Sequence, residues 1–338
     1  MASRLPGNRP PGNPPPSNRP SSNRPRRTLL AALVAASVAV PVSSAARPAA
    51  VPAPVPAAAA LAPLRDATHD TLAERYAVNR DGIRAAERMA AGHGDRKRAA
   101  ALRGMADPAR QFLTFDGRNG GRSAEVFGDL SRAERIAVLV PGSDTGLDRY
   151  ERFRAGAAAL RRELGGDRAA VVAWLGYRTP PAVSLTALTP GRAQDAAPEL
   201  RRFVRELHAA VPAARVSLLC HSYGSVVCAA AAPGLDVADI VLHGSPGTGA
   251  DSAGRLDTRA TVWAGRGADD WIADVPHVRL RLPFATVGFG TDPVSGEFGA
   301  RPFDAGGGGH SDYLKPGSVS LRNIARIVNG RALKAPRA

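Results

Sequence analysis

Apolar positions in this chain recur with two different spacings. Between Leu64 and Ala106 they return every three or four residues with charged residues between them, which predicts two or three helices broken near Gly92–Gly94. Beyond residue 110, short apolar runs alternate with longer amphipathic segments. The expected strands are Gln111–Asp116, Ser123–Gly128, Arg135–Val140, Ala169–Leu175, Arg215–Cys220, Asp239–His243 and Ala260–Ala264. The expected helices are Asp148–Leu164, Arg192–Ala210, Tyr223–Ala232 and Ser318–Asn329.

This alternation of strands and helices predicts a protein of the α/β class. Apolar strands separated by amphipathic helices are typical of a mainly parallel sheet that is covered on both faces. We therefore expect a mainly parallel central sheet with helices on both faces, preceded by an N-terminal helical extension and a hairpin. Loops rich in glycine or proline follow the strands, where sheets of this kind place their binding sites.

The first 45 residues have the pattern of a signal peptide. A tract rich in Pro, Asn and Arg precedes the apolar run Thr28–Val40, which is too short to cross a bilayer and is followed by small residues. Arg26 and Arg27 fit the twin-arginine export pattern as well as an ordinary export signal, and both routes stay open. We expect a secreted or cell-envelope-associated protein with no stable membrane span once the signal is cleaved.

The rest of the chain is expected to form three parts. Residues 46–63 consist largely of Ala, Pro and Val, which is typical of a disordered linker. Residues 64–108 hold the N-terminal helical segment, and residues 109–332 hold the α/β domain. One such domain fills the length of the chain, so a single catalytic centre is expected.

A formal net charge of +15 and a pI near 11.1 raise the question of a nucleic-acid partner. Six arginines belong to the predicted signal peptide, and without them the basic residues exceed the acidic ones by nine. The remainder holds neither a run of like charges nor a row of aromatic residues, so we expect no nucleic-acid binding. Because the sequence contains no Walker loop, HExxH or CxxC motif, we expect neither a cofactor nor a metal.

Ser222 is the candidate nucleophile. It lies between an apolar strand and an apolar helix, as in a nucleophile elbow, where the sharp turn requires small residues two positions before and after the serine. Gly224 meets this requirement, and Cys220 departs from it with a small side chain that is not glycine. The alternative role for Ser222 is an N-cap of the helix. Ser245 is a rival, but Pro246 follows it and has no N–H to donate to an oxyanion, so we expect Ser245 to shape its loop.

The candidate base is His310, which follows the four glycines 306–309 near the end of the chain. The alternative is a surface histidine in a flexible loop. Among the other histidines, His221 is expected to point away from the nucleophile across the turn. Surface positions on helical segments are expected for His69, His93 and His208.

The candidate acid is Asp270, with its neighbour Asp269 as the alternative. Both follow an apolar strand between the serine and the histidine, where a carboxylate can orient the imidazole and stabilise the imidazolium. An oxyanion needs two N–H donors, which we expect from Tyr223 and from Ser143 or the adjacent Asp144.

Two further features leave alternatives open. Cys220 and Cys228 form either a disulfide, as an oxidising compartment favours, or two buried thiols. The segment Pro276–Ala300 contains three phenylalanines, which either cover the site or pack on the edge of the sheet. These are Phe284, Phe289 and Phe298.

These elements together resemble a secreted α/β-hydrolase family of unknown function that is common in high-GC Gram-positive bacteria. The matching stretches are Phe112–Asp116, Val140-Pro141-Gly142, His221–Gly224, Gly244–Gly247, Gly309–Ser311 and Tyr313. The resemblance covers roughly residues 65–330. It implies the α/β-hydrolase fold and a serine-hydrolase site on Ser222, Asp270 and His310, and it implies no substrate.

The expected function is hydrolysis of an ester or related acyl bond through an acyl-serine intermediate, without a cofactor. Such an enzyme would be esterase-like or lipase-like and would act on a small-molecule or lipid-like acyl substrate. A cell-envelope acyltransferase with the same triad is an alternative. A binding module that keeps the fold without turnover is another.

Overall fold

The computed structural model describes residues 55–283, 285–331 and 333. The predicted signal peptide and the first part of the predicted linker lie outside the described residues. All of the described residues belong to one compact unit, Ala53–Ala338.

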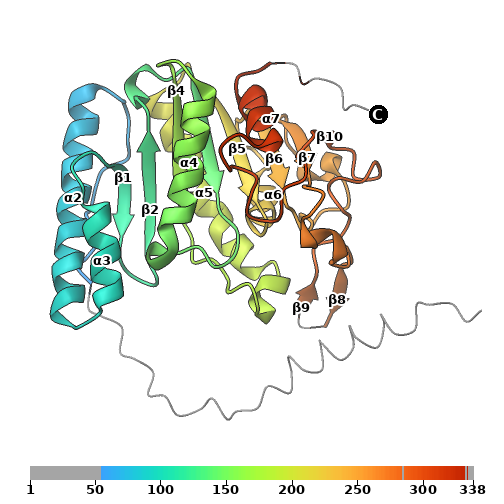
Figure 1. The fold of residues 1–338 in the computed structure, drawn as a ribbon, viewed down its shortest axis with the longest axis horizontal. Coiled ribbons are helices and arrows are strands. Elements are labelled where there is room, and N and C mark those ends of the chain that lie inside the picture. The colour runs from blue at the N-terminus through green and yellow to red at the C-terminus, as the bar shows by residue number, and fades with distance from the viewer. Residues whose placement is uncertain (1–54, 284, 332, 334–338) are drawn as a thin grey trace, which may run out of the picture. The chain divides into compact units, whose positions relative to one another are not determined.

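An eight-stranded sheet runs through the middle of this unit in the order β1-β2-β4-β3-β5-β6-β7-β10 (Figure 1). The strands are β1 (Gln111–Asp116), β2 (Arg122–Phe127), β3 (Arg135–Val140), β4 (Ala169–Leu175), β5 (Arg215–His221), β6 (Asp239–His243), β7 (Thr261–Gly265) and β10 (Arg301–Pro302). The pairs β1–β2 and β2–β4 are antiparallel, and the others are parallel. In Figure 1 the strand β2 points upward, and β4 runs antiparallel to it. The strands parallel to β4 therefore end at the lower edge of the sheet. The loops that follow them meet there.

Helices cover the sheet on both faces, as the sequence predicts. One face packs against α4 (Tyr150–Leu164) and α7 (Val319–Val328), and the other packs against α5 (Gly191–Ala210) and α6 (Gly224–Ala231). Two separate apolar cores result, and the strand β4 between them is buried along its whole length. This fold is that of the α/β hydrolases.

The N-terminal helices α2 (His69–Gly92) and α3 (Arg96–Met105) pack against each other, and α2 packs against β1. Both begin at a polar cap. The Thr68 hydroxyl accepts from the N–H of Thr71, and the Asp95 carboxylate accepts from that of Arg98. The helical spacing before residue 106 is therefore confirmed, including its break between Gly92 and Gly94.

Three short strands had no counterpart among the predicted elements. The strands β8 (Leu280–Leu282) and β9 (Ala285–Val287) form a separate antiparallel pair, and β10 adds two residues to the sheet beside β7. They are too short to show a period in the sequence, because two or three residues define no alternation.

A buried ion pair joins the residue before β1 to the paired strand β2. Two nitrogens of the Arg110 guanidinium donate to the two carboxylate oxygens of Glu125 at 2.7 and 2.9 Å. The side chains are only 6% and 1% exposed. A charge so far from water is tolerated only while its partner is present.

We expect Arg110→Met to lower the free energy of unfolding by about 3–5 kcal/mol, because the buried charge of Glu125 would keep only its longer contact with Arg154, at 3.4 Å. The control is Arg132→Met, whose partner Asp167 is exposed, and which is expected to cost less than about 1 kcal/mol. Denaturant unfolding measures both. The double variant Arg110→Met with Glu125→Gln is expected to regain part of the loss, and a single variant no costlier than the control would contradict this assignment.

Candidate active site

Ser222 occupies a sharp turn between the end of β5 and the start of α6. Its φ angle is +52°, in the left-handed region that non-glycine residues rarely adopt. The strained turn is held by the Ser222 N–H, which donates to the carbonyl of His243 on the neighbouring strand at 3.1 Å. The Ser222 side chain is thereby presented at the carboxyl edge of the sheet.

Two glycines make room for this turn. A Cβ on Gly224 would lie 2.5 Å from the carbonyl oxygen of Val140, so only glycine lets α6 begin so close to β3. A Cβ on Gly142 would lie 2.7 Å from the Cβ of Ser222. The loop after β3 therefore passes directly over the candidate nucleophile, as a donor of backbone N–H groups must.

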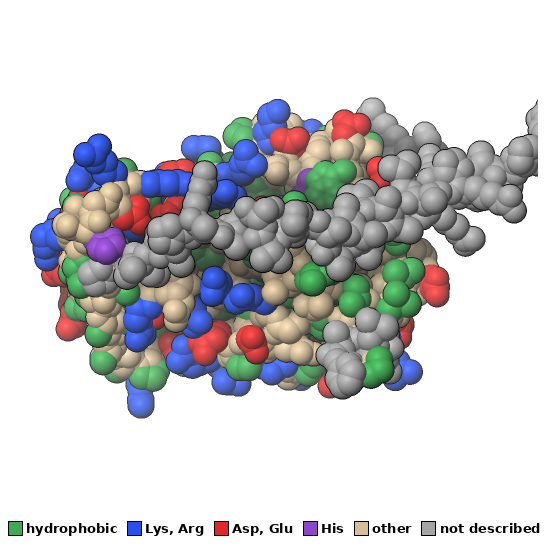
Figure 2. All heavy atoms as spheres, turned by 90° about the horizontal axis from the view of Figure 1, so that it is seen from below, with side chains coloured by type: hydrophobic (Ala, Val, Ile, Leu, Met, Phe, Trp, Pro, Cys, Tyr) green, Lys and Arg blue, Asp and Glu red, His purple; other side chains and the backbone are tan. Residues whose placement is uncertain are grey.

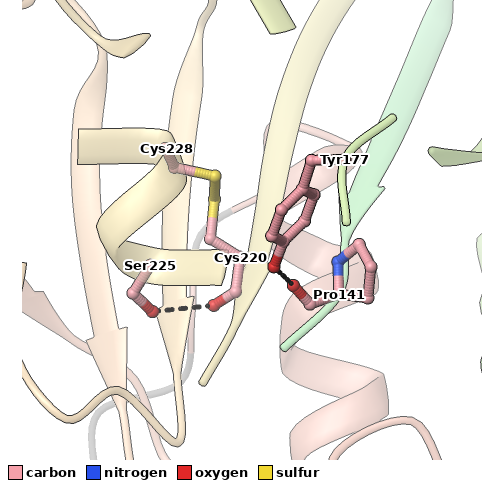
Figure 3. The surroundings of a disulfide bond; sticks show 5 residues. All are labelled: Pro141, Tyr177, Cys220, Ser225 and Cys228. Carbon is pink, nitrogen blue, oxygen red and sulfur yellow. Dashed lines mark hydrogen bonds between the residues drawn. A yellow bond between two sulfur atoms is a disulfide. The ribbon is translucent and has the colours of Figure 1, made fainter. Parts of the chain in front are cut away.

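The two cysteines form a disulfide, Cys220–Cys228, which settles the alternative that the sequence left open (Figure 3). It joins the strand before the turn to the helix after it. The Ser225 hydroxyl also donates to the Cys220 carbonyl at 3.1 Å. The disulfide and this hydrogen bond therefore both join β5 to α6. On the other side, the Tyr177 hydroxyl donates to the carbonyl of Pro141 at 2.6 Å and holds the loop after β3.

The structure brings together the three side chains proposed from the sequence, although they come from three separate loops. His310 Nε2 lies 2.9 Å from Ser222 Oγ. His310 Nδ1 lies 2.9 and 3.1 Å from the two carboxylate oxygens of Asp270. A carboxylate only accepts hydrogen bonds, so Nδ1 carries the proton and Nε2 is free to accept the hydroxyl proton of Ser222.

Asp270 rather than Asp269 faces the imidazole, because the Asp269 side chain is exposed to solvent. Burial alone would raise the pKa of Asp270. Hydrogen bonds from His310, Tyr313 and the N–H of Ile272 lower it by more, so the net pKa lies below the ordinary value. The carboxylate therefore stays ionised at neutral pH.

Tyr313 is a partner of this carboxylate to which the sequence analysis gave no role. Its hydroxyl donates to Asp270 at 2.5 Å and accepts from the N–H of Gly267 at 3.0 Å. Gly244 lies next to both groups with φ +59°, and a Cβ there would stand 3.0 Å from the Asp270 carboxylate and from the Tyr313 ring. Gly244 and Tyr313 belong to the stretches on which the family resemblance rests. The sequence does not show that these two residues lie next to each other.

The glycine run before His310 packs closely rather than hanging free. A Cβ on Gly267 would lie 1.9 Å from the carbonyl of Gly308, and the N–H of Ala268 donates to the carbonyl of Gly306 at 2.9 Å. The absence of a side chain at Gly267 thus lets the loop that carries the acid lie directly against the histidine loop.

The prediction that His221 points away from the site is wrong. Its ring packs 4.8 Å from the ring of His310, and its Nε2–H donates to the His310 main-chain carbonyl at 2.7 Å. Behind it, the ring of His243 lies 5.3 Å away. The residue before the nucleophile therefore supports the loop of the candidate base, because β5 extends one residue further than predicted and directs this ring inward.

Burial of these two rings makes the folded state sensitive to acid. It lowers the pKa of His221 from 6.5 to about 4 and the pKa of His243 well below 6.5. Below about pH 6.5 the unfolded chain binds a proton at each ring, whereas the folded chain does not bind one at His221 until near pH 4. We therefore expect the free energy of unfolding to decrease as the pH is lowered from about 6.5 to about 4, by up to about 1.4 kcal/mol per pH unit for each ring.

Urea unfolding at a series of pH values measures this slope. His221→Asn is expected to reduce it, and His208→Asn, on α5 and partly exposed, is expected to leave it unchanged. Equal slopes in both variants would show that another group carries the acid sensitivity.

The candidate oxyanion donors lie on the two loops beside the nucleophile. Among the described residues, the N–H groups of Tyr223 and Ser143 donate to no protein acceptor. The N–H of Asp144 donates to the carbonyl of Pro180 at 3.0 Å. This leaves Ser143 rather than Asp144 as the second candidate.

Ser245 shapes its own loop, as expected. Its hydroxyl donates to the carbonyl of Gly247 and accepts from the N–H of the same residue. The three histidines expected at surface positions lie on or beside helices. His69 is exposed at the start of α2, His93 is exposed just after its end, and His208 is partly exposed on α5.

The phenylalanines of the segment 276–300 divide between the two predicted roles. Phe289 packs edge-on against the ring of Tyr223, with ring centres 5.7 Å apart, and so borders the site. Phe298 is fully buried in the apolar core, and Phe284 lies outside the described residues. Trp271, which is 55% exposed, covers the ring of His310 at 4.7 Å.

Neither a membrane span nor a metal cluster is found in the part of the chain that the structure describes. None of its helices is both long and apolar enough to cross a bilayer. No group of three or more His, Cys, Asp or Glu residues there is arranged to hold a metal ion.

Comparisons with known proteins relate the chain to hydrolases. A family model described as alpha/beta hydrolase matches residues 116–280. An uncharacterized protein of Mycobacterium tuberculosis is 30% identical over 253 residues, which cover 68% of this chain and 86% of the relative. A second uncharacterized protein of the same species is 30% identical over 64% of this chain and 38% of its own length.

Solved structures are also similar. A serine hydrolase without a lid from Xanthomonas campestris has a TM-score of 0.43 and 20% identity, and the match covers 68% of this chain and 98% of that one. An esterase of Mycobacterium marinum has a TM-score of 0.39 and 16% identity, over 79% and 90% of the two chains.

Proposed function

Since the chain belongs to the alpha/beta hydrolase family, we propose that it hydrolyses an ester or related acyl bond through an acyl intermediate on Ser222. The observation that carries the proposal is the 2.9 Å contact between His310 Nε2 and Ser222 Oγ, with Asp270 bonded to the other ring nitrogen. This is the arrangement that activates a serine hydroxyl. Such convergence favours an enzyme over a binding module that has lost turnover.

In the first half of the proposed reaction, His310 accepts the hydroxyl proton while Ser222 Oγ attacks the substrate carbonyl. The N–H groups of Tyr223 and Ser143 stabilise the negative charge that develops on the carbonyl oxygen. The C–O bond to the leaving group then breaks, and the alcohol departs with the proton held by His310. The acyl group remains on Ser222.

In the second half, water takes the place of the alcohol. His310 removes a proton from the water as the oxygen attacks the acyl carbon, and it returns a proton to Ser222 Oγ when the acyl bond breaks. Throughout, the ionised Asp270 holds Nδ1–H and stabilises the imidazolium. The net reaction consumes one water and requires no cofactor.

A fluorophosphonate probe tests this assignment, because it reacts only with an activated serine. We expect the wild-type chain and the Ser245→Ala control to become labelled, and Ser222→Ala to remain unlabelled. Ser245 is the matched control because it is buried in the neighbouring loop. Undiminished labelling of Ser222→Ala would overturn the proposal.

We also propose that the protein acts outside the cytoplasm, either secreted or associated with the cell envelope. The signal-peptide pattern of residues 1–45 supports this, and so does the disulfide at the elbow, since such bonds persist in oxidising compartments. N-terminal sequencing of the protein recovered outside producing cells is expected to begin near residue 45. Recovery of only the uncleaved chain, inside the cells, would contradict export.

A further inference from the structure

Large apolar side chains are exposed in only two segments of the described chain. The first segment holds Val183, Leu185 and Leu188, and the second holds Trp271, Val278 and Leu280. We refer to these six residues as the apolar rim. Elsewhere in residues 55–280, 286–331 and 333, the large hydrophobic side chains are buried or partly buried. Exposed apolar residues that gather in this way mark an interaction surface.

Both segments border the candidate active site. The N–H of Gly288, just after β9, donates to the carbonyl of Leu188 at 2.8 Å and so joins the two segments. The Tyr223 hydroxyl donates to the carbonyl of Thr189 at 2.7 Å, and the Trp271 ring covers that of His310. The apolar rim is therefore continuous with the residues on either side of the nucleophile.

The exposure of these side chains favours a broad apolar partner over a single bound chain. Val183 is 98% exposed and Leu185 is 68% exposed. Side chains lining a groove for one acyl chain would be half covered by its walls, whereas side chains at protruding tips are suited to entering the surface of a lipid aggregate. In Figure 2, which views the lower edge of Figure 1, hydrophobic side chains gather toward the right of this face.

The charge of the first segment favours an anionic surface. Residues 176–192 contain Arg178 and Arg192 and no acidic residue. In the second segment Arg279 is paired with Asp251, at 2.6 and 2.7 Å, so the argument from charge rests on the first segment. Basic residues beside exposed apolar ones are typical of proteins that bind negatively charged lipid surfaces.

We propose that the apolar rim docks the site on the surface of an anionic lipid aggregate, from which the acyl ester passes to Ser222. This inference rests on the proposed function and names its substrate class, a water-insoluble acyl ester held in a lipid surface. Apolar side chains enter the aggregate, and the arginines lie at the level of its charged headgroups.

Binding is tested with vesicles that the enzyme cannot consume. Vesicles of ether-linked phosphatidylcholine, with and without ether-linked phosphatidylglycerol, are sedimented with the full chain. We expect the chain to partition onto the anionic vesicles and much less onto the neutral ones. The double variant Val183→Ser with Leu185→Ser is expected to bind at least about tenfold more weakly.

Matched controls separate the rim from general effects. Thr186→Ser alters the same loop with the loss of a single methyl group and keeps the apolar rim intact, so it is expected to bind like the wild type. Arg178→Gln is expected to weaken binding to anionic vesicles, whereas Arg259→Gln is expected to leave it unchanged. Arg259 is 91% exposed and precedes β7, at the opposite edge of the sheet from the site.

Kinetics separate failure of this inference from failure of the proposed function. The double variant is expected to hydrolyse a soluble short-chain ester at the wild-type rate and to lose about tenfold in rate on an emulsified long-chain ester. Hydrolysis of the soluble ester without vesicle binding would overturn the docking surface and leave the function standing. Vesicle binding with no hydrolysis or probe labelling would overturn the function instead. A dimer that the rim substitutions dissociate would show that the rim binds a second copy, and would overturn the inference.

Discussion

Loss of the Ser222 hydroxyl, of the His310 ring or of both together is expected to lower kcat for acyl hydrolysis by about a millionfold in each case. The three effects are equal because the hydroxyl attacks only while the imidazole 2.9 Å away accepts its proton. Once one member is missing, the other has nothing left to contribute. The residual rate, about a thousandfold or more above that in water, comes from substrate binding and the oxyanion donors.

Steady-state rates of Ser222→Ala, His310→Ala and the double variant on one soluble ester measure this. His208→Ala is the control for removing a histidine, and circular dichroism checks that each variant is folded. If the double variant loses the product of the two single losses, the two residues act independently. That result would contradict the geometry of a shared proton.

The positions of the long strands could be predicted because burial shows directly in the sequence. Strand β4 is buried at every residue, and its unbroken apolar run distinguishes it from the amphipathic helices on either side. The predicted and observed bounds of β3, β4 and β6 are identical. Strand β5 ends one residue later than predicted, at His221, because pairing with His243 on β6 extends it.

The candidate nucleophile could be predicted because a nucleophile elbow imposes requirements on neighbouring residues. A serine between an apolar strand and an apolar helix, with glycine two residues on, is visible in one short stretch around Ser222. The disulfide could not be decided in the same way. Whether Cys220 and Cys228 meet depends on how sharply the chain turns at φ +52°, which residue types alone do not give.

The groups that surround the triad depend on contacts between distant segments. His221 lies beneath the loop of a histidine 89 residues later, and Tyr313 reaches an aspartate 43 residues earlier. No periodicity records such pairs. Glycine at position 244 could be noticed in the sequence, but the reason for it, a carboxylate 3.0 Å from the place of its absent Cβ, emerges only in three dimensions.

Asp270→Asn is expected to lower kcat about ten-thousandfold while leaving the fold intact. The carboxylate accepts hydrogen bonds from the His310 ring, the Tyr313 hydroxyl and the Ile272 N–H. An asparagine offers one acceptor oxygen in place of two, and its amide group must face one of these partners. The ring of His310 accommodates it by moving its proton from Nδ1 to Nε2, and in that tautomer it cannot accept the proton of Ser222.

The tautomer argument distinguishes this variant from one that merely weakens the site. Tyr313→Phe removes a hydrogen bond that lowers the pKa of Asp270 but leaves the carboxylate and its two acceptor oxygens in place. Its kcat at neutral pH is expected to fall far less than that of Asp270→Asn. Because the pKa of Asp270 would rise, the loss of activity in acid is expected to begin at a higher pH.

Asp269→Asn, on the exposed neighbour, is expected to change neither rate nor pH profile. A pH–rate series for the three variants measures this, and an Asp270→Asn rate near that of Tyr313→Phe would show that the carboxylate does not set the proton position on His310.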